Sequence, residues 1–134
     1  MKTKVLRIVI IDDNMHLLSS LEQLLTMLGH SVFDASTPES GIALALERRP
    51  NLLICDISLQ GSMNGYGVAR MLRMNAALAG TFLVALSGNS QQDDREKSAQ
   101  AGFDRHVAKP ASLADIKGIL DEALLHQLRG GYAA

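Results

Sequence analysis

The stretch VLRIVIIDDN, residues 5–14, passes from an almost continuous aliphatic run directly into two adjacent carboxylates. A parallel strand that is buried on both faces has such a run instead of an alternating pattern. Further runs of strand length follow at Ser31–Ala35, Leu52–Cys55, Phe82–Leu86 and His106–Ala108. The opening stretch, with Val5–Ile11 as its strand, therefore predicts a buried parallel sheet, but it leaves open why a buried strand ends in two negative charges.

Longer segments with helical patterns follow these runs, and apolar residues at helical spacing are clearest over Met15–Leu28. We expect helices over about 15–28, 38–48, 68–76, 90–101 and 113–128. Their ends carry capping residues, namely Asn14, Thr37 with Pro38, Ser90 with Asp93, and Ser112 with Asp115. Strands that alternate with helices predict an α/β fold of the (βα)5 type, in which a doubly wound, five-stranded parallel sheet is covered on both faces.

Length, charge and cysteine content restrict the classes of protein that fit. A chain of 134 residues suits one domain, and a formal net charge of −1 gives no overall attraction to nucleic acid or to an anionic membrane. The single cysteine, Cys55, cannot form an internal disulfide, and the first apolar run is too short for a signal peptide or a membrane span. We therefore expect a cytoplasmic domain over residues 1–128 and a frayed tail over residues 129–134.

Polar side chains stand at the carboxyl ends of four of the predicted strands. They are Asp12, Asp13, Asp56, Ser87 and Lys109. In an open parallel sheet, ligands bind just outside the carboxyl ends of the strands. We therefore expect these five side chains to meet at one edge of the sheet.

Carboxylates that meet in this way repel one another. Neighbouring strands are about 4.8 Å apart, and two carboxylates at about 5 Å repel by roughly 3 kcal/mol at an effective dielectric constant of 20. Either one carboxyl group holds a proton, or a hard divalent cation lies among them. A set of oxygen ligands favours Mg²⁺ or Mn²⁺ over Zn²⁺.

The same set of groups suits phosphoryl transfer, in which neutralising charge is the main catalytic task. Lys109 supplies a cation for a phosphoryl oxygen, Ser87 supplies a hydroxyl donor, and Asp56 could be the nucleophile that forms an aspartyl phosphate. Ordinary structural roles stay open for single residues. Asp13 could simply cap a helix without binding a metal ion. Cys55 is expected to be a small core residue. The expected positions at the surface or at helix ends are those of His16, His30 and His126.

Over about residues 5–128, the sequence resembles the receiver domain of two-component response regulators. The resemblance rests on Asp12-Asp13-Asn14, on Asp56 after LLIC, on Ser87 after LVAL, and on Lys109-Pro110 after HVA. The stretches GHSV, NGYGVARMLR and AGFDRHVAKP resemble receivers of hybrid histidine kinases in particular. The resemblance implies a flavodoxin-like three-layer sandwich with the strand order 2-1-3-4-5.

The resemblance also implies a role for each site residue. Asp56 would accept a phosphoryl group from a histidine kinase or a histidine phosphotransfer protein. Asp12, Asp13, Asp56 and the backbone carbonyl of Ser58 would hold Mg²⁺ or Mn²⁺. Ser87 and Lys109 would bind the phosphoryl group, and Ser87 and His106 would form the switch that controls a downstream protein.

Three positions depart from the common pattern of the family. His106 stands where Tyr or Phe is usual, Gln60 replaces a frequent proline, and Ala111 follows Pro110 where Phe is common. These changes leave the chemistry of the site intact. They concern the switch and the surface through which the domain would act on a partner.

Other functions remain as alternatives. A phosphorylation-independent interaction module with the same fold is the main one, since metal binding alone would fit it. A haloacid-dehalogenase-like phosphatase needs a second Asp two residues after the nucleophile, where this chain has Ser58 or Asn14. ALSGN does not match the G-x-S-x-G motif of a serine hydrolase. A wide apolar face on the last helix could also form a homodimer. We expect a signalling phospho-acceptor that contacts proteins, with no direct binding to nucleic acid or membrane, instead of an enzyme acting on other substrates.

Overall fold

A computed structural model of the chain describes residues 4–88 and 92–130. Its strands are β1 (Arg7–Ile11), β2 (Ser31–Ala35), β3 (Leu52–Asp56), β4 (Phe82–Ser87) and β5 (Arg105–Ala108). Its helices are α1 (Met15–Met27), α2 (Pro38–Arg48), α3 (Gly65–Arg73), the short 3₁₀ helix η1 (Ala76–Leu78), α4 (Gln92–Ala101) and α5 (Leu113–Leu128). Strands and helices alternate as the sequence predicts.

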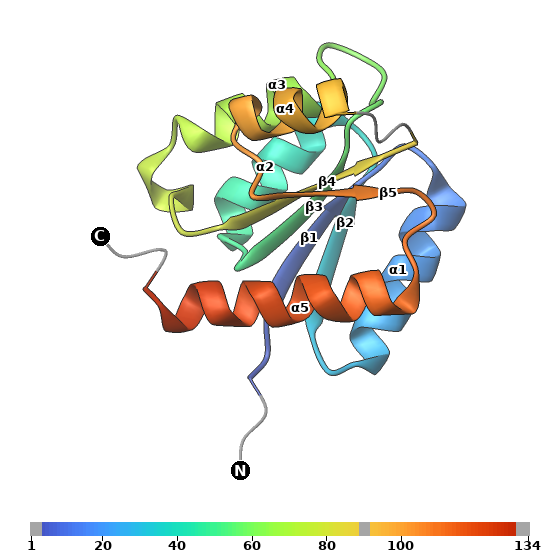
Figure 1. The fold of residues 1–134 in the computed structure, drawn as a ribbon, viewed down its shortest axis with the longest axis vertical. Helices are drawn as coiled ribbons and strands as arrows, with labels where there is room; N and C mark the ends of the chain where they lie inside the picture. Colours follow the sequence, from blue (N-terminus) through green and yellow to red (C-terminus); the bar gives the residue numbers. More distant parts are fainter. Residues whose placement is uncertain (1–3, 89–91, 131–134) are drawn as a thin grey trace.

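The strands form one parallel sheet in the order β2-β1-β3-β4-β5. Figure 1 shows the sheet between two layers of helices, with α1 and α5 on one face and α2, α3 and α4 on the other. The predicted (βα)5 fold and its strand order are therefore confirmed. Because β1 lies beside β3, and β4 separates β3 from β5, the ends of these four strands meet along one edge.

Alternate residues of each central strand enter two separate hydrophobic clusters, one on each face of the sheet. In β1, Ile8 and Ile10 face α1 and α5, whereas Val9 and Ile11 face α2 and α3. All four side chains are fully buried. The near-continuous aliphatic run at the start of the chain is thus explained by burial on both faces, as a parallel sheet requires. None of the helices in the described part of the chain is long and apolar enough to cross a membrane.

The capping predictions are confirmed wherever the structure describes them. The side chain of Asn14 accepts a hydrogen bond from the amide of Leu17, and Ser112 forms a capping box with Asp115. Thr37 also caps α2, although its partner in the capping box is Ser40. The predicted cap at Ser90 lies outside the described residues.

The predicted helix over 68–76 is wrong at both ends, because α3 begins at Gly65 and ends at Arg73. Asn64 caps its first turn by accepting a hydrogen bond from the amide of Gly67. The first residue of α3 packs directly on the backbone that follows β3, a position in which a Cβ atom of residue 65 would lie 2.4 Å from the carbonyl oxygen of Asp56. Sequence periodicity does not report such a close approach between backbones. The other bounds differ from the prediction by two residues or fewer.

Candidate functional site

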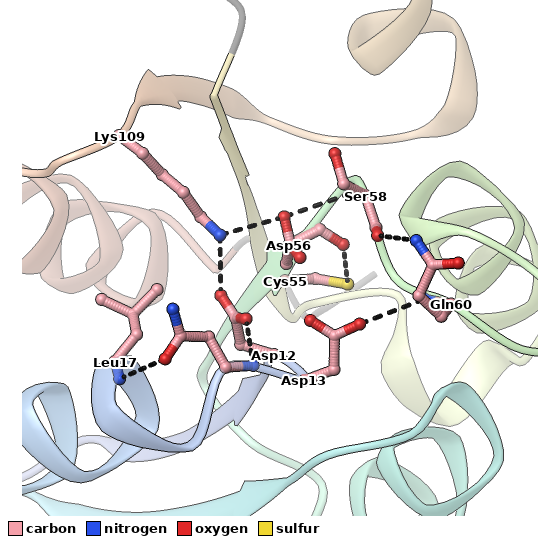
Figure 2. A network of polar contacts seen from close by, with 9 residues as sticks. Asp12, Asp13, Leu17, Cys55, Asp56, Ser58, Gln60 and Lys109 are labelled. Carbon is pink, nitrogen blue, oxygen red and sulfur yellow. Dashed lines mark hydrogen bonds and ion pairs between the residues drawn. The ribbon is translucent and has the colours of Figure 1, made fainter.

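Two buried carboxylates end neighbouring strands. Asp12 directly follows β1 and is fully buried, and Asp56 is the last residue of β3 and only 3% exposed. The exposed Asp13 follows Asp12 and completes a group in which one carboxylate oxygen of each residue lies within 4.8 Å of the others. Figure 2 shows the three carboxylates facing one another. The pairing of β1 with β3, at Ile11 and Cys55, places them side by side.

The cation of Lys109 joins the two buried carboxylates. Its Nζ lies 3.0 Å from Oδ2 of Asp12 and 3.2 Å from Oδ1 of Asp56 (Figure 2). The residue follows β5, and its amide donates a hydrogen bond of 2.7 Å to the carbonyl of Ser87 at the end of β4. Three carboxylates and one ammonium leave the site with a net charge of −2 when all four groups are ionised.

Backbone amides fix the orientation of both buried carboxylates. The amide of Asn14 donates to Oδ1 of Asp12 at 2.9 Å, and the amide of Ser58 donates to Oδ1 of Asp56 at 3.1 Å. Each carboxylate therefore accepts a hydrogen bond from the residue two positions further along the chain, in the tight turn that ends its strand. The second oxygen of each group is held by no backbone amide that the described residues show.

The electrostatic state of the site follows from burial and from these contacts. Burial raises the pKa of Asp56, and the nearby Asp12 carboxylate adds to this, while the Ser58 amide and Lys109 oppose it. Burial alone would lower the pKa of Lys109, but contacts with Asp12 and Asp56 outweigh it and raise the pKa overall. The lysine is therefore held as a cation at neutral pH, beside a carboxylate that is destabilised by its surroundings.

Gln60 is a site residue that the sequence analysis noted only as a departure from a pattern. Its amide donates to Oδ2 of Asp13 at 3.3 Å, and its Nε2 donates to the carbonyl of Ser58 at 3.4 Å (Figure 2). It thus contacts two of the four groups predicted to bind a metal ion. A proline at this position would lack the amide donor. The sequence shows only that Gln60 stands where proline is frequent in the family, and this does not indicate which groups Gln60 contacts.

The structure brings Asp12, Asp13, Asp56 and Lys109 into direct contact or close approach. Ser87 is 95% buried and ends β4 beside them, where it pairs with Ala108 in the sheet. His106 lies elsewhere, because its side chain contacts α4 through Oγ of Ser98. The predicted switch residue is therefore separate from the carboxylate group.

The donor set suits a hard divalent cation. Three carboxylates with oxygens within 4.8 Å of one another match the oxygen ligands that Mg²⁺ and Mn²⁺ prefer. The residues present therefore fit a magnesium ion.

Replacing Asp13 with Asn should weaken Mg²⁺ binding by about tenfold or more, because each 1.4 kcal/mol of lost attraction is a factor of ten. Asp13 is exposed, so the fold should tolerate this change. Calorimetric titration with Mg²⁺ measures the effect, and Asp121→Asn, an equal change of charge on the exposed face of α5, is the matched control. Equal affinities for the two variants would exclude Asp13 as a ligand.

The comparisons with known proteins agree with this geometry. The family profile described as response regulator receiver domain matches residues 8–121. The crystal structure of a CheY-like response regulator receiver domain protein from Methanospirillum hungatei is 26% identical and superposes with a TM-score of 0.85, covering 95% of this chain and 100% of that one.

Two curated relatives are larger proteins. The virulence sensor protein BvgS of Bordetella bronchiseptica is 31% identical over 123 residues, which are 88% of this chain and 10% of BvgS. The transcriptional regulatory protein AfsQ1 of Streptomyces coelicolor is 30% identical over 125 residues, which are 92% of this chain and 52% of AfsQ1. The chain thus spans about half or less of the length of these relatives.

Proposed function

The chain belongs to the response regulator receiver family, and we propose that it accepts a phosphoryl group on the Asp56 carboxylate in a reaction that requires Mg²⁺. The donor is the phosphohistidine of a histidine kinase or of a histidine phosphotransfer protein. A carboxylate oxygen of Asp56 forms the new P–O bond, the P–N bond breaks, and the imidazole leaves with the electron pair and takes up a proton. The observation that carries this proposal is the contact of Lys109 with both Asp12 and Asp56.

Each group of the site has a task in this reaction. Asp12, Asp13, Asp56 and the carbonyl of Ser58 would hold Mg²⁺, which would neutralise charge on the transferring group. Lys109 already lies beside the nucleophilic carboxylate. After the transfer it forms an ion pair with a phosphoryl oxygen. The hydroxyl of Ser87, at the end of the adjacent strand, donates a hydrogen bond to another phosphoryl oxygen.

The buried environment supports Asp56 as the acceptor. Its charged form is destabilised by burial and by Asp12, and phosphorylation converts the carboxylate into an acyl phosphate whose negative charge lies further out, on the phosphoryl oxygens. The phosphorylated and unphosphorylated forms then differ in the contacts of Ser87 and Lys109, and this difference shifts the population towards the form that a downstream partner protein recognises.

Removing Mg²⁺ should abolish phosphorylation of the wild-type protein. Incubation with acetyl phosphate and Mg²⁺ should add the mass of one phosphoryl group, and the same incubation with a chelator should lower the labelled fraction by roughly 100-fold or more, because the carboxylates then repel the donor. Intact mass measures the product, which should survive acid and be lost in base. Measurable Mg²⁺ binding without any labelling would instead favour a phosphorylation-independent interaction module.

A further inference from the structure

The turn that follows β3 is anchored in the core by alternate residues. Ile57 and Leu59 are buried in the hydrophobic cluster that faces α2 and α3, whereas Ser58 and Gln60 are exposed. The amide of Gly65 also donates a hydrogen bond of 2.9 Å to the carbonyl of Ile57. Because close-packed neighbours hold the backbone here, Ser58 and Gln60 stand on a rigid support although their side chains meet water.

Gln60 makes two contacts with the site, one from its backbone and one from its side chain. Its amide donates to Oδ2 of Asp13 at 3.3 Å, and its Nε2 donates to the carbonyl of Ser58 at 3.4 Å. Figure 2 shows Gln60 reaching the Ser58 carbonyl with one end and the Asp13 carboxylate with the other. One uncharged residue therefore contacts two of the groups that the proposed function assigns to Mg²⁺.

The backbone contact of Gln60 orients the carboxylate that is otherwise least constrained. The buried Asp12 and Asp56 each accept a hydrogen bond from the amide two residues further along the chain. Asp13 is exposed, and among the described residues the amide of Gln60 is the only backbone donor to its carboxylate. A carboxylate has about four lone-pair positions, so this bond restricts rotation of the side chain and still leaves positions for a metal ion.

The side-chain contact of Gln60 orients the Ser58 carbonyl. The amide of Ser58 donates to Oδ1 of Asp56 at 3.1 Å, and its carbonyl accepts from Nε2 of Gln60, so both backbone polar groups of Ser58 have a partner. A carbonyl oxygen has two lone pairs, and one of them remains for a cation. Ligands that are already held in place lose less freedom when they bind, so both contacts of Gln60 prepare the site for an ion.

We propose that Gln60 is a positioning residue that restricts the movement of the Asp13 carboxylate and the Ser58 carbonyl, and that it thereby makes the site select Mg²⁺ over Ca²⁺. The proposal rests on the metal site of the proposed function, but not on the transfer of a phosphoryl group. Mg²⁺ requires near-ideal octahedral geometry at about 2.0–2.1 Å, whereas Ca²⁺ accepts flexible arrangements at about 2.3–2.6 Å. Ligands that cannot move apart favour the smaller ion, and releasing them reduces this preference.

Calorimetric titrations of the full chain with Mg²⁺ and, separately, with Ca²⁺ test the proposal. Gln60→Met keeps the backbone amide and the length of the side chain but cannot donate to the Ser58 carbonyl. It should weaken Mg²⁺ binding by about tenfold, at the lower end of the range for partners that orient metal ligands, because the contact is exposed. Ca²⁺ binding should weaken by less than about threefold. Gln100→Met, the same exchange at an exposed position of α4, should change neither affinity.

Gln60→Pro also removes the amide that contacts Asp13, and it should therefore weaken Mg²⁺ binding more than Gln60→Met does. Thermal unfolding checks that the proline variant is folded. The amide acts through the Asp13 carboxylate, so the difference between the two Gln60 variants should disappear when each is combined with Asp13→Ala. A difference that persists in the Asp13→Ala background would show that the amide of Gln60 does not act through Asp13.

The two ions separate positioning from a general effect on the fold. Equal losses of Mg²⁺ and Ca²⁺ affinity in Gln60→Met, or no loss of Mg²⁺ affinity, would overturn the proposal. Incubation of the same samples with acetyl phosphate, read by intact mass, separates it from the proposed function. A wild-type protein that prefers Mg²⁺ but gains no phosphoryl mass contradicts the function alone. Labelling of the wild-type protein, together with an unchanged ion preference in Gln60→Met, contradicts the role of Gln60 alone.

Discussion

Replacing Asp56 with Asn should eliminate phosphorylation. The amide of Asn has no carboxylate oxygen to form an acyl phosphate, so the labelled fraction after incubation with acetyl phosphate and Mg²⁺ should fall by about 100-fold or more. Intact mass before and after the incubation measures this fraction, and digestion should place the phosphate of the wild-type protein on the peptide that contains Asp56. Labelling of the variant at the wild-type level would show that another residue is the acceptor.

Asp56→Asn should be more stable than the wild-type protein in the absence of metal. If so, the loss of labelling in this variant cannot be explained by misfolding. Burial and Asp12 raise the pKa of Asp56 above its ordinary value of 3.8. The folded chain then binds the proton more tightly than the unfolded chain does, so the free energy of unfolding falls as the pH rises through the interval between 3.8 and the raised pKa. At neutral pH this decrease in the free energy of unfolding is complete. Asp56→Asn avoids the decrease because Asn carries no charge.

Thermal unfolding in a chelating buffer at pH 7 measures this difference. The midpoint of Asp56→Asn should lie a few degrees above that of the wild-type protein, since about 1 kcal/mol moves the midpoint of a domain of this size by roughly 2–8 °C. The gap should close as the pH is lowered and the wild-type carboxyl group becomes protonated. A variant that is less stable at every pH would show that Asp56 does not carry the electrostatic cost inferred from its surroundings.

Gly65→Ala should destabilise the fold more than any exposed substitution. The added Cβ would lie 2.4 Å from the carbonyl oxygen of Asp56 and 2.7 Å from Cα of Ile57, and both are backbone atoms. The helix propensity of Ala favours the change by only about 1 kcal/mol, whereas forcing two backbone segments apart costs roughly 2–4 kcal/mol. The midpoint of thermal unfolding should therefore fall by about 5–15 °C.

Gly88→Ala is the matched control, because a Cβ at this position would meet no atom of the described residues within 4 Å. Its midpoint should stay within a few degrees of the wild-type value, as is usual for exposed substitutions. Gly65→Ala should also slow phosphorylation, since the backbone that it displaces carries the Asp56 carboxylate. If both variants unfold at the wild-type temperature, the close approach of α3 to the end of β3 is not rigid.

Much of the fold and of the candidate site could be predicted because local sequence carries the relevant signals. The buried run before Asp12 identifies a parallel strand, and polar residues at the ends of four predicted strands place the site at one edge of the sheet. These inferences need only the period of the apolar residues and the geometry of a parallel sheet. The burial of Cys55, expected from its place in the aliphatic run before Asp56, is also confirmed.

Features that depend on contacts between distant segments could not be predicted in this way. The expectation for His30 and His126 was incomplete. Both side chains are partly buried: Nδ1 of His30 accepts a hydrogen bond from the amide of Leu6 at 3.0 Å, and the ring of His126 packs at 5.4 Å from that of Phe82. Each histidine contacts a residue that lies far away in the sequence, so no local sequence pattern predicts the contact. Ser98 and His106 are close in the sequence, but their contact also could not be predicted, because it depends on how α4 packs against β5.

The bridge formed by Lys109 also has a consequence for the order in which the chain folds. The lysine and Asp12 are separated by 97 positions in the sequence, so their contact closes a loop over most of the chain. Contacts of such long range form late, because the entropy of loop closure opposes them. During synthesis from the N-terminus, β1 and β3 can pair before β5 exists, and Asp12 and Asp56 then face each other without their cation. The two carboxylates thus oppose early assembly of the central strands, and the last strand to emerge removes that opposition when it docks.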